Sequence, residues 1–87
     1  MALVHIPTHM RSITEGRDRV SVPGQTLRQV FESLEQACPG MKEQVVADGR
    51  IRPEIAVFVD GVIAESGLVE RVSEDAEIHL IPALGGG

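Results

Sequence analysis

Three consecutive glycines, Gly85, Gly86 and Gly87, close the sequence and are its strongest candidate for chemistry. Glycine has no side chain and few backbone restrictions, so a glycine run can enter a channel that is too narrow for other residues. The five residues after Pro82, Leu84 among them, span roughly 17 Å when they are extended at about 3.3 Å each. The one reactive group that such a tail can deliver is the α-carboxylate of Gly87, which is ionised at neutral pH.

The other side chains that could do chemistry form no motif. His5, His9 and His79 lack the spacing of metal ligands, and Cys38 is the only cysteine. We interpret Cys38 as a partly buried small residue rather than a nucleophile, and the histidines as surface or packing residues. No phosphate-binding loop, nucleophile elbow or zinc-binding helix motif occurs in the sequence. We therefore expect this chain to hold no metal and no cofactor of its own.

The composition describes one small acidic domain. The chain has 87 residues, 43% of them hydrophobic, and a net charge of -5. The negative charge and the presence of only two aromatic residues, Phe31 and Phe58, argue against a nucleic-acid or anionic-membrane partner. They favour a partner with a basic docking surface. A single cysteine, with no signal peptide and no long apolar stretch, predicts a cytoplasmic protein.

One helix is predicted in the first half of the chain. Thr26 and Gln29 form a capping-box pair, in which each side chain can satisfy a backbone amide at the start of the helix. Pro39 and Gly40 end the helix. The apolar residues between these signals recur at helical spacing along one stripe. They are Leu27, Val30, Phe31, Leu34 and Ala37.

Five segments have the alternation or the composition of strands. They are residues 3–6, 19–22, 55–59, 62–64 and 77–81. The first two are expected to pair as a hairpin. Asp60 and Gly61 predict a two-residue hairpin turn between the third and the fourth.

The connections between these elements are of three kinds. Residues 8–18 have the composition of a loop. Residues 41–47 are expected to form a second, shorter helix that Asp48 and Gly49 close. Residues 67–74 predict a polar connection with a few apolar anchors. The candidate anchors are Leu68, Val69 and Val72.

The order of elements is strand, strand, helix, strand, strand, strand. This order predicts an α+β fold of the β-grasp type, in which one main helix covers one face of a mixed sheet. A ferredoxin-like split βαβ fold is the alternative. It requires a second helix as long as the first, and residues 41–47 are too few for that.

Several segments in this order are similar to those of a known family. They are residues 6–7, 38–40, 57–61 and 74–87. Together they resemble the MoaD/ThiS family of ubiquitin-like sulfur carriers over essentially the whole chain. The most specific part is a C-terminal strand followed by Pro82, a few small or apolar residues, and the pair Gly86-Gly87. The turn before that strand is often Asp-Gly-Asp in the family, whereas Glu74-Asp75-Ala76 stands here, which affects only the detail of the turn.

The resemblance implies a sulfur carrier that is not itself an enzyme. In that family an E1-like adenylating enzyme (MoeB/ThiF-like) joins AMP to the carboxylate of the terminal glycine, here Gly87. A sulfur donor such as a cysteine desulfurase or a rhodanese then supplies sulfur to give a thiocarboxylate. A downstream synthase accepts that sulfur. ATP and Mg²⁺ are expected to belong to the activating partner.

The tail and the folded part have different tasks in this scheme. A side chain at Gly86 or Gly87 would crowd the nucleotide and the sulfur donor. Ordering the tail costs about 1–2 kcal/mol of backbone entropy per residue, so the folded part must supply the affinity for partners. We therefore divide the chain into a β-grasp domain, residues 1–82, and a flexible tail, residues 83–87.

Strand alternation indicates which face of the sheet docks to partners. If Ile78 faces the helix, then His79 and Ile81 point to the open face, and if Val57 faces the helix, Phe58 does too; His5 points out by the same alternation. These residues are on neighbouring strands of a β-grasp and are expected to form one partner-binding patch near the tail. The alternative is that Phe58 or Ile81 is a half-buried packing residue, or that the register is reversed.

Three other functions remain open from the sequence. The chain could be the small subunit of molybdopterin synthase, whose tail inserts into a catalytic subunit. It could be a ubiquitin-like modifier that is joined through Gly87 to lysines of target proteins. It could also be a plain binding module, because a glycine run at a terminus can be idle or an expression scar. The sequence does not identify the metabolite that receives the sulfur.

Overall fold

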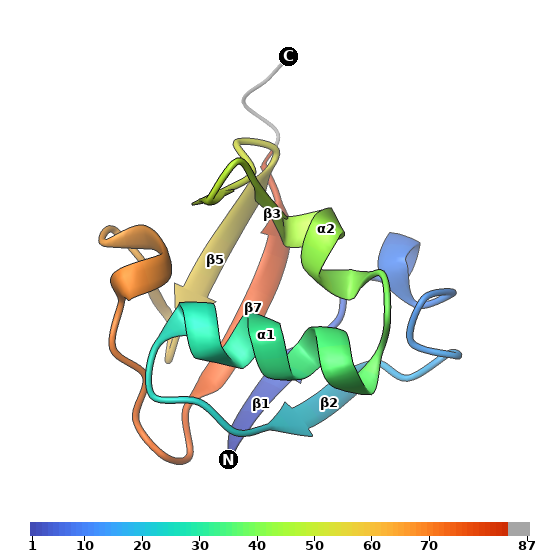
Figure 1. Ribbon diagram of the computed structural model, residues 1–87, viewed down its shortest axis with the longest axis horizontal. Coiled ribbons are helices and arrows are strands. Elements are labelled where there is room, and N and C mark those ends of the chain that lie inside the picture. The colour runs from blue at the N-terminus through green and yellow to red at the C-terminus, as the bar shows by residue number, and fades with distance from the viewer. Residues whose placement is uncertain (84–87) are drawn as a thin grey trace.

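The computed structural model describes residues 1–83, which form a mixed five-stranded sheet with one main helix packed on one face (Figure 1). The strand order in the sheet is β2-β1-β7-β5-β6. The bounds are β1, Ala2–His5; β2, Arg19–Val22; β5, Ile55–Val59; β6, Val62–Ile63; and β7, Glu77–Pro82. All five predicted strands are therefore confirmed, with ends that differ by at most one residue. The predicted β-grasp architecture is confirmed with them.

The last strand, β7, occupies the centre of the sheet. It runs parallel to β1, with Val4 opposite Ile78, and antiparallel to β5, with Val57 opposite Leu80. These four side chains are at most 4% exposed and belong to the core. A central strand is hydrogen-bonded on both sides, so β7 gives the chain that follows it a fixed point of departure. It ends at the opposite end of the molecule from the N-terminus (Figure 1).

The main helix, α1 (Leu27–Ala37), begins at the predicted capping box. Thr26 Oγ1 accepts a hydrogen bond from the amide of Gln29 at 3.3 Å. Gln29 Oε1 accepts one from the amide of Gln25 at 2.8 Å, one residue before the expected partner. The two side chains thus satisfy one backbone donor of the first helical turn and one just before the N-cap.

The predicted apolar stripe of α1 packs into the core against the sheet, except for its last member. Ala37 is exposed, and Cys38 is 2% exposed in its place, which also confirms that Cys38 packs inside. Cys38 lies four residues after Leu34, and its amide donates to the Leu34 carbonyl. With 3.6 residues per turn, the core-facing position moves here from the third to the fourth residue after Leu34. The confirmed members are all 0% exposed: Leu27, Val30, Phe31 and Leu34.

The segment after α1 differs from the prediction of a second helix over residues 41–47. The chain forms a short helix and then a small separate hairpin. The bounds are α2, Met41–Val45; β3, Val46–Ala47; and β4, Arg50–Ile51. Asp48 and Gly49 have φ values of 54° and 73°. Two consecutive positive φ values are typical of the type I′ turn, which joins antiparallel strands, so this pair closes a hairpin and not a helix.

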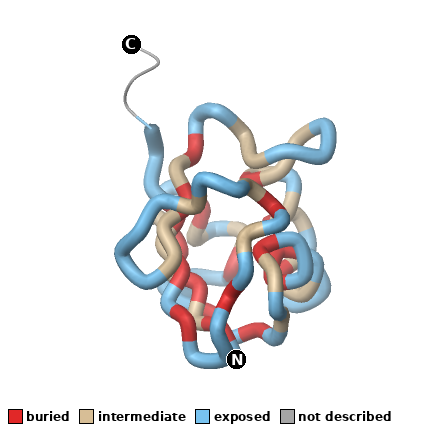
Figure 2. The backbone as a smooth tube through the Cα atoms, turned by 90° about the vertical axis from the view of Figure 1, so that its left-hand side faces the viewer, coloured by how far each residue is buried: buried red, intermediate tan, exposed pale blue. Residues whose placement is uncertain are grey.

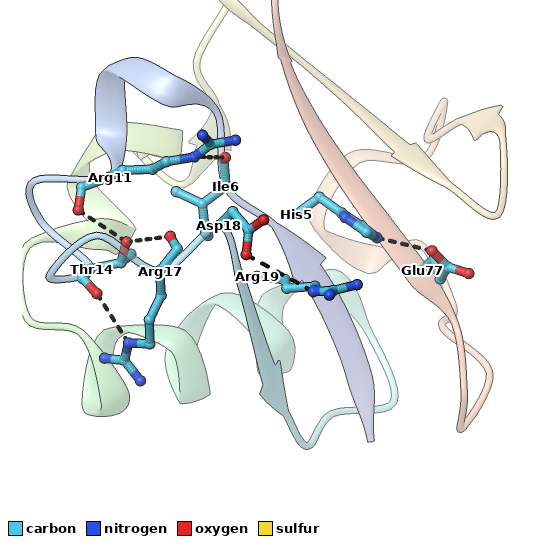
Figure 3. A network of polar contacts seen from close by, with 8 residues as sticks. All are labelled: His5, Ile6, Arg11, Thr14, Arg17, Asp18, Arg19 and Glu77. Atoms are coloured by element: carbon cyan, nitrogen blue, oxygen red, sulfur yellow. Dashed lines mark hydrogen bonds and ion pairs between the residues drawn. The ribbon is translucent and has the colours of Figure 1, made fainter.

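The predicted loop between β1 and β2 is more ordered than its composition suggests. It contains the 3-10 helix η1 (Thr8–Met10), and Met10 is 2% exposed. Thr14 is fully buried, and its Oγ1 lies 2.7 Å from the carbonyl oxygen of Arg17 and 3.2 Å from that of Arg11 (Figure 3). Backbone carbonyls of the same segment therefore satisfy this buried hydroxyl.

Two of the three predicted anchors in the connection before β7 are confirmed. Leu68, in the 3-10 helix η2 (Gly67–Val69), and Val72 are buried. Val69 is 64% exposed, so the prediction that it anchors the connection was wrong. Successive side chains of a 3-10 turn point about 120° apart, so Leu68 and Val69 cannot both face the core.

Burial follows the elements throughout the described part of the chain. In Figure 2 the buried residues recur along the strands and helices, while the turns at the surface are mostly exposed. No helix among residues 1–83 has the length and apolar character that crossing a membrane requires.

The side chain of Glu35 connects α1 to the start of α2. Its carboxylate accepts hydrogen bonds from the amide of Gly40 at 3.0 and 3.2 Å and from the amide of Lys42 at 2.9 Å. The hydrogen bond from Gly40 and then that from Lys42 lower the pKa of Glu35 below its ordinary value. Desolvation opposes them less strongly, and the charge of Lys42 adds a still smaller lowering effect. The ionised form of Glu35 therefore stabilises the folded state.

Glu35→Gln is expected to lower the free energy of unfolding at neutral pH and to matter less in acid. A carboxyl whose pKa is lowered by folding contributes stability above its unfolded pKa, and this contribution is lost as the pH falls through the folded-state pKa. The variant should therefore differ most from the wild type above pH 4.5 and approach it below. Urea unfolding at several pH values measures the difference. A constant difference from neutral to acid pH would contradict the role of this carboxylate.

Candidate functional site

The chain leaves the sheet at the end of β7 through three exposed residues, Ile81, Pro82 and Ala83. Pro82 lies opposite Ile55 on β5, and the amide of Ala83 donates to the carbonyl oxygen of Glu54 at 2.7 Å. The backbone is therefore held as far as Ala83. The predicted tail residues that follow lie outside the described residues, so their role stays a prediction, as does the boundary between domain and tail. They are Leu84, Gly85, Gly86 and Gly87.

A row of side chains crosses the sheet on the face opposite α1. The register pairs Phe58 with His79, and His79 with His5. Residues paired in this way point to the same side of a sheet. All three are half-buried, whereas Val57 and Ile78, their neighbours along the strands, are at most 2% exposed. The predicted alternation is therefore confirmed for these positions.

The row extends beyond the predicted patch on both sides. Ile63 of β6 pairs with Phe58, and Arg19 of β2 pairs with His5. Ile63 is 48% exposed, and Ile81, which shares this face, is 44% exposed. Sequence reasoning missed Ile63, although the two-residue turn before it fixes the pairing with Phe58 and would have revealed it. We use the term central row for Ile63, Phe58, His79, His5 and Arg19.

Two histidines of the central row, His5 and His79, form a cluster with Glu77, which lies beside the row on β7. His5 Nε2 lies 2.9 Å from Glu77 Oε1 (Figure 3), and the rings of His5 and His79 stack with their centroids 4.1 Å apart and their planes within 3°. The spacing of the histidines in the sequence, which predicted no ligand motif, does not reveal this cluster, because His5 and Glu77 are 72 positions apart and are brought together by the parallel pairing of β1 with β7. His9 lies in η1 and takes no part. The arrangement offers two imidazoles and a carboxylate to a cation or to a proton.

Proteins of similar sequence and structure include sulfur carriers. The sulfur carrier protein CysO of Mycobacterium tuberculosis is 29% identical over 89 aligned residues, which span 97% of this chain and 96% of that protein. The crystal structure of M. tuberculosis CysO gives a TM-score of 0.92 at 26% identity, over 97% of this chain and 100% of that one. A chain of the Amycolatopsis orientalis BexX/CysO complex gives a TM-score of 0.93 at 27% identity, over 100% of both chains.

A modifier protein and a family profile complete the comparison. SAMP1 of Haloferax volcanii gives a TM-score of 0.74 at 26% identity, over 99% of this chain and 98% of that one. The profile of the ThiS family matches residues 4–87, which is nearly the whole chain and includes the terminal glycines. The sheet order, the single main helix and the position of β7 agree with the β-grasp fold of these neighbours. The chain therefore belongs to the ThiS family.

Proposed function

We propose that this chain is a ubiquitin-like sulfur carrier whose Gly87 holds sulfur as a C-terminal thiocarboxylate. The observation that carries the proposal is the match to the ThiS family through residue 87, which includes the Gly86-Gly87 pair. The name of the M. tuberculosis relative, sulfur carrier protein CysO, supports the same function. In this scheme the chain is a protein co-substrate and not an enzyme.

Loading proceeds in two steps at the terminal carboxyl of Gly87. In the first, an E1-like partner joins a carboxylate oxygen to the α-phosphorus of ATP, and pyrophosphate leaves. In the second, hydrosulfide attacks the acyl carbon, a C–S bond forms, and AMP leaves with the electrons of the C–O bond. A protein persulfide as donor gives an acyl disulfide instead, which a thiol must reduce. ATP and Mg²⁺ bind to the partner, where the charge on the phosphates is neutralised.

The folded part of the chain supplies the affinity for the partner. Ordering the tail costs about 1–2 kcal/mol per residue, and contacts elsewhere must offset this cost. The central row and Ile81 offer aromatic and aliphatic surface on β7, which leads into the tail, and on its neighbours β5 and β6. The complex of A. orientalis CysO with BexX supports a carrier that docks to a partner protein.

Phe58→Ala is expected to raise the KM of the E1-like partner for this chain by roughly tenfold while leaving kcat and the fold intact. A central aromatic residue of an interface typically contributes more than about 1 kcal/mol, and about 1.4 kcal/mol corresponds to tenfold. Pyrophosphate release at several carrier concentrations measures the effect. Val69→Ala is the matched control, because Val69 is apolar and 64% exposed but lies on η2. Equal effects of both variants, or unfolding of Phe58→Ala, would contradict the docking role.

The intact mass of the chain after incubation with its E1-like partner, ATP and sulfide tests the function. A sulfur carrier gains the mass difference between sulfur and oxygen, only when ATP is present, and fragmentation places the gain at Gly87. The partner is first shown to release pyrophosphate in the presence of this chain. If the mass then stays unchanged, the chain is not a sulfur carrier.

A second candidate function is protein modification. The similarity to SAMP1, a small archaeal modifier protein, favours it. In the same incubation, carried out with cell extract, a modifier forms species of higher mass that contain an isopeptide bond between Gly87 and a lysine. Both functions share the adenylation step, so they are distinguished by the acceptor and not by the activation.

A further inference from the structure

We propose that His5, Glu77 and His79 form a binding site for a divalent transition metal of the zinc class on the open face of the sheet. This site is independent of the tail and of whether Gly87 carries sulfur. One donor atom from each residue, two imidazole nitrogens and one carboxylate oxygen, lies within 4.8 Å of the others. Three protein donors leave one position of a tetrahedral ion open to water or to a partner.

The backbone of the sheet positions all three donors. His5 and His79 are register partners on β1 and β7, and Glu77 precedes His79 by two residues, so it points to the same face. The amide of Glu77 donates to Asp60 Oδ1 at 2.9 Å, and its carbonyl oxygen accepts from the Asp60 amide at 2.8 Å. The donors therefore project from hydrogen-bonded strands and not from loops, which keeps them close enough for small side-chain rotations to bring them around one ion.

A small rotation of the rings completes the site. Imidazole lone pairs lie in the ring plane, so the stacked rings of His5 and His79, parallel within 3°, do not both point at one ion. The χ2 torsion of histidine is broad, and turning the rings about it brings the lone pairs together at little cost. The ion then takes the place of the hydrogen bond between His5 Nε2 and Glu77 Oε1, and the same two atoms become ligands.

The chemistry of the donors selects the class of ion. Imidazole nitrogen suits Zn²⁺, Cu²⁺ and Ni²⁺, whereas Mg²⁺ and Ca²⁺ prefer oxygen ligands alone. The side chains of His5 and Glu77 are 28% and 57% exposed, so an ion reaches them from solvent. The net charge of the chain, -5, also favours a cation over an anion.

Titration of Zn²⁺ into the purified full chain, followed by the NMR signals of the histidine rings and by calorimetry, tests the site. The chain has three histidines, so His9, which lies outside the cluster, is an internal reference. We expect Zn²⁺ to shift the ring signals of His5 and His79 but not those of His9, and Mg²⁺ to shift none. His5→Asn and His79→Asn are each expected to weaken Zn²⁺ binding at least about tenfold, the lower end of the loss seen even for residues that support ligands. His9→Asn is the matched control and keeps the wild-type affinity.

The opposite results would overturn the site. They are ring signals of His5 and His79 that do not respond to Zn²⁺, wild-type affinity in both cluster variants, or an equal loss in His9→Asn. Circular dichroism establishes that each variant folds. If a histidine variant fails to fold, Glu77→Gln carries the same test, because its side chain is more than half exposed.

Discussion

A chain with one alanine added after Gly87 is expected to lose sulfur loading by at least about a hundredfold. The extra residue moves the terminal carboxylate by about 3.3 Å. A displacement of about 1 Å can already cost a factor of roughly 10² in rate, because the reacting atoms leave their near-attack geometry. The alanine also adds a methyl group where the partner's channel is proposed to admit only glycine. The initial rate of thiocarboxylate formation, followed by intact mass, measures the loss.

Two controls separate chemistry from docking in this experiment. An alanine added before Met1 gives the same extra mass at the other end of the molecule, away from the end of β7, and should leave loading unchanged (Figure 1). The chain extended after Gly87 should still compete with the wild type for the E1-like partner, because its central row is intact. Undiminished loading of the extended chain would contradict the proposed function. Loss of competition would show that the extension acts on docking.

Most of the fold was predictable because its signals act over a few residues. The Thr26 cap, the alternation in β5 and the turn at Asp60 and Gly61 each depend on neighbours in sequence, and the structure confirms all three. Asp60 and Gly61 have φ values of 50° and 84°, as a type I′ hairpin turn requires. Agreement between local signals and the overall fold is what a foldable sequence needs.

The wrong predictions share a different cause. Ala37 and Val69 are small or aliphatic and were expected inside, but the helix phase and the 3-10 turn direct them to solvent. The chain after Val45 pairs as a hairpin, although its composition also suits a helix. In each case residue type and spacing were compatible with more than one local geometry, and the geometry adopted decided which side chains face the core.

Some features of the candidate sites were predictable from the sequence, and others required the pairing of strands. Strand alternation placed Phe58 and His79 on the open face, as the structure confirms. The role of the glycine tail was proposed from a terminal motif and stays a prediction. Ile63 required a register, and the cluster of His5 with Glu77 required the parallel pairing of β1 with β7. The pairing of β1 with β7 places these side chains together without any spacing that a sequence motif could record.

Phe31→Ala is expected to lower the free energy of unfolding by about 3–5 kcal/mol, the usual cost of removing a buried aromatic side chain from a core. Phe31 is 0% exposed and lies in the middle of α1, within the core that the helix forms with the sheet. A domain of this length has a total stability of roughly 4–13 kcal/mol, so the change removes a large part of it. The melting temperature should fall by on the order of 12–40 °C, which thermal unfolding measures directly.

Phe58→Ala provides the matched comparison, because it removes the same side chain from the other face of the sheet. Phe58 is half-buried and lies opposite His79 in the central row. Its truncation leaves no enclosed cavity, so the loss of stability should be well below that of Phe31→Ala. Phe58→Ala should nevertheless raise the KM of the E1-like partner for this chain, because Phe58 lies in the proposed docking surface. Equal destabilisation by the two variants would place Phe58 in the core, and the open face would then lose the aromatic residue on which docking is proposed to depend.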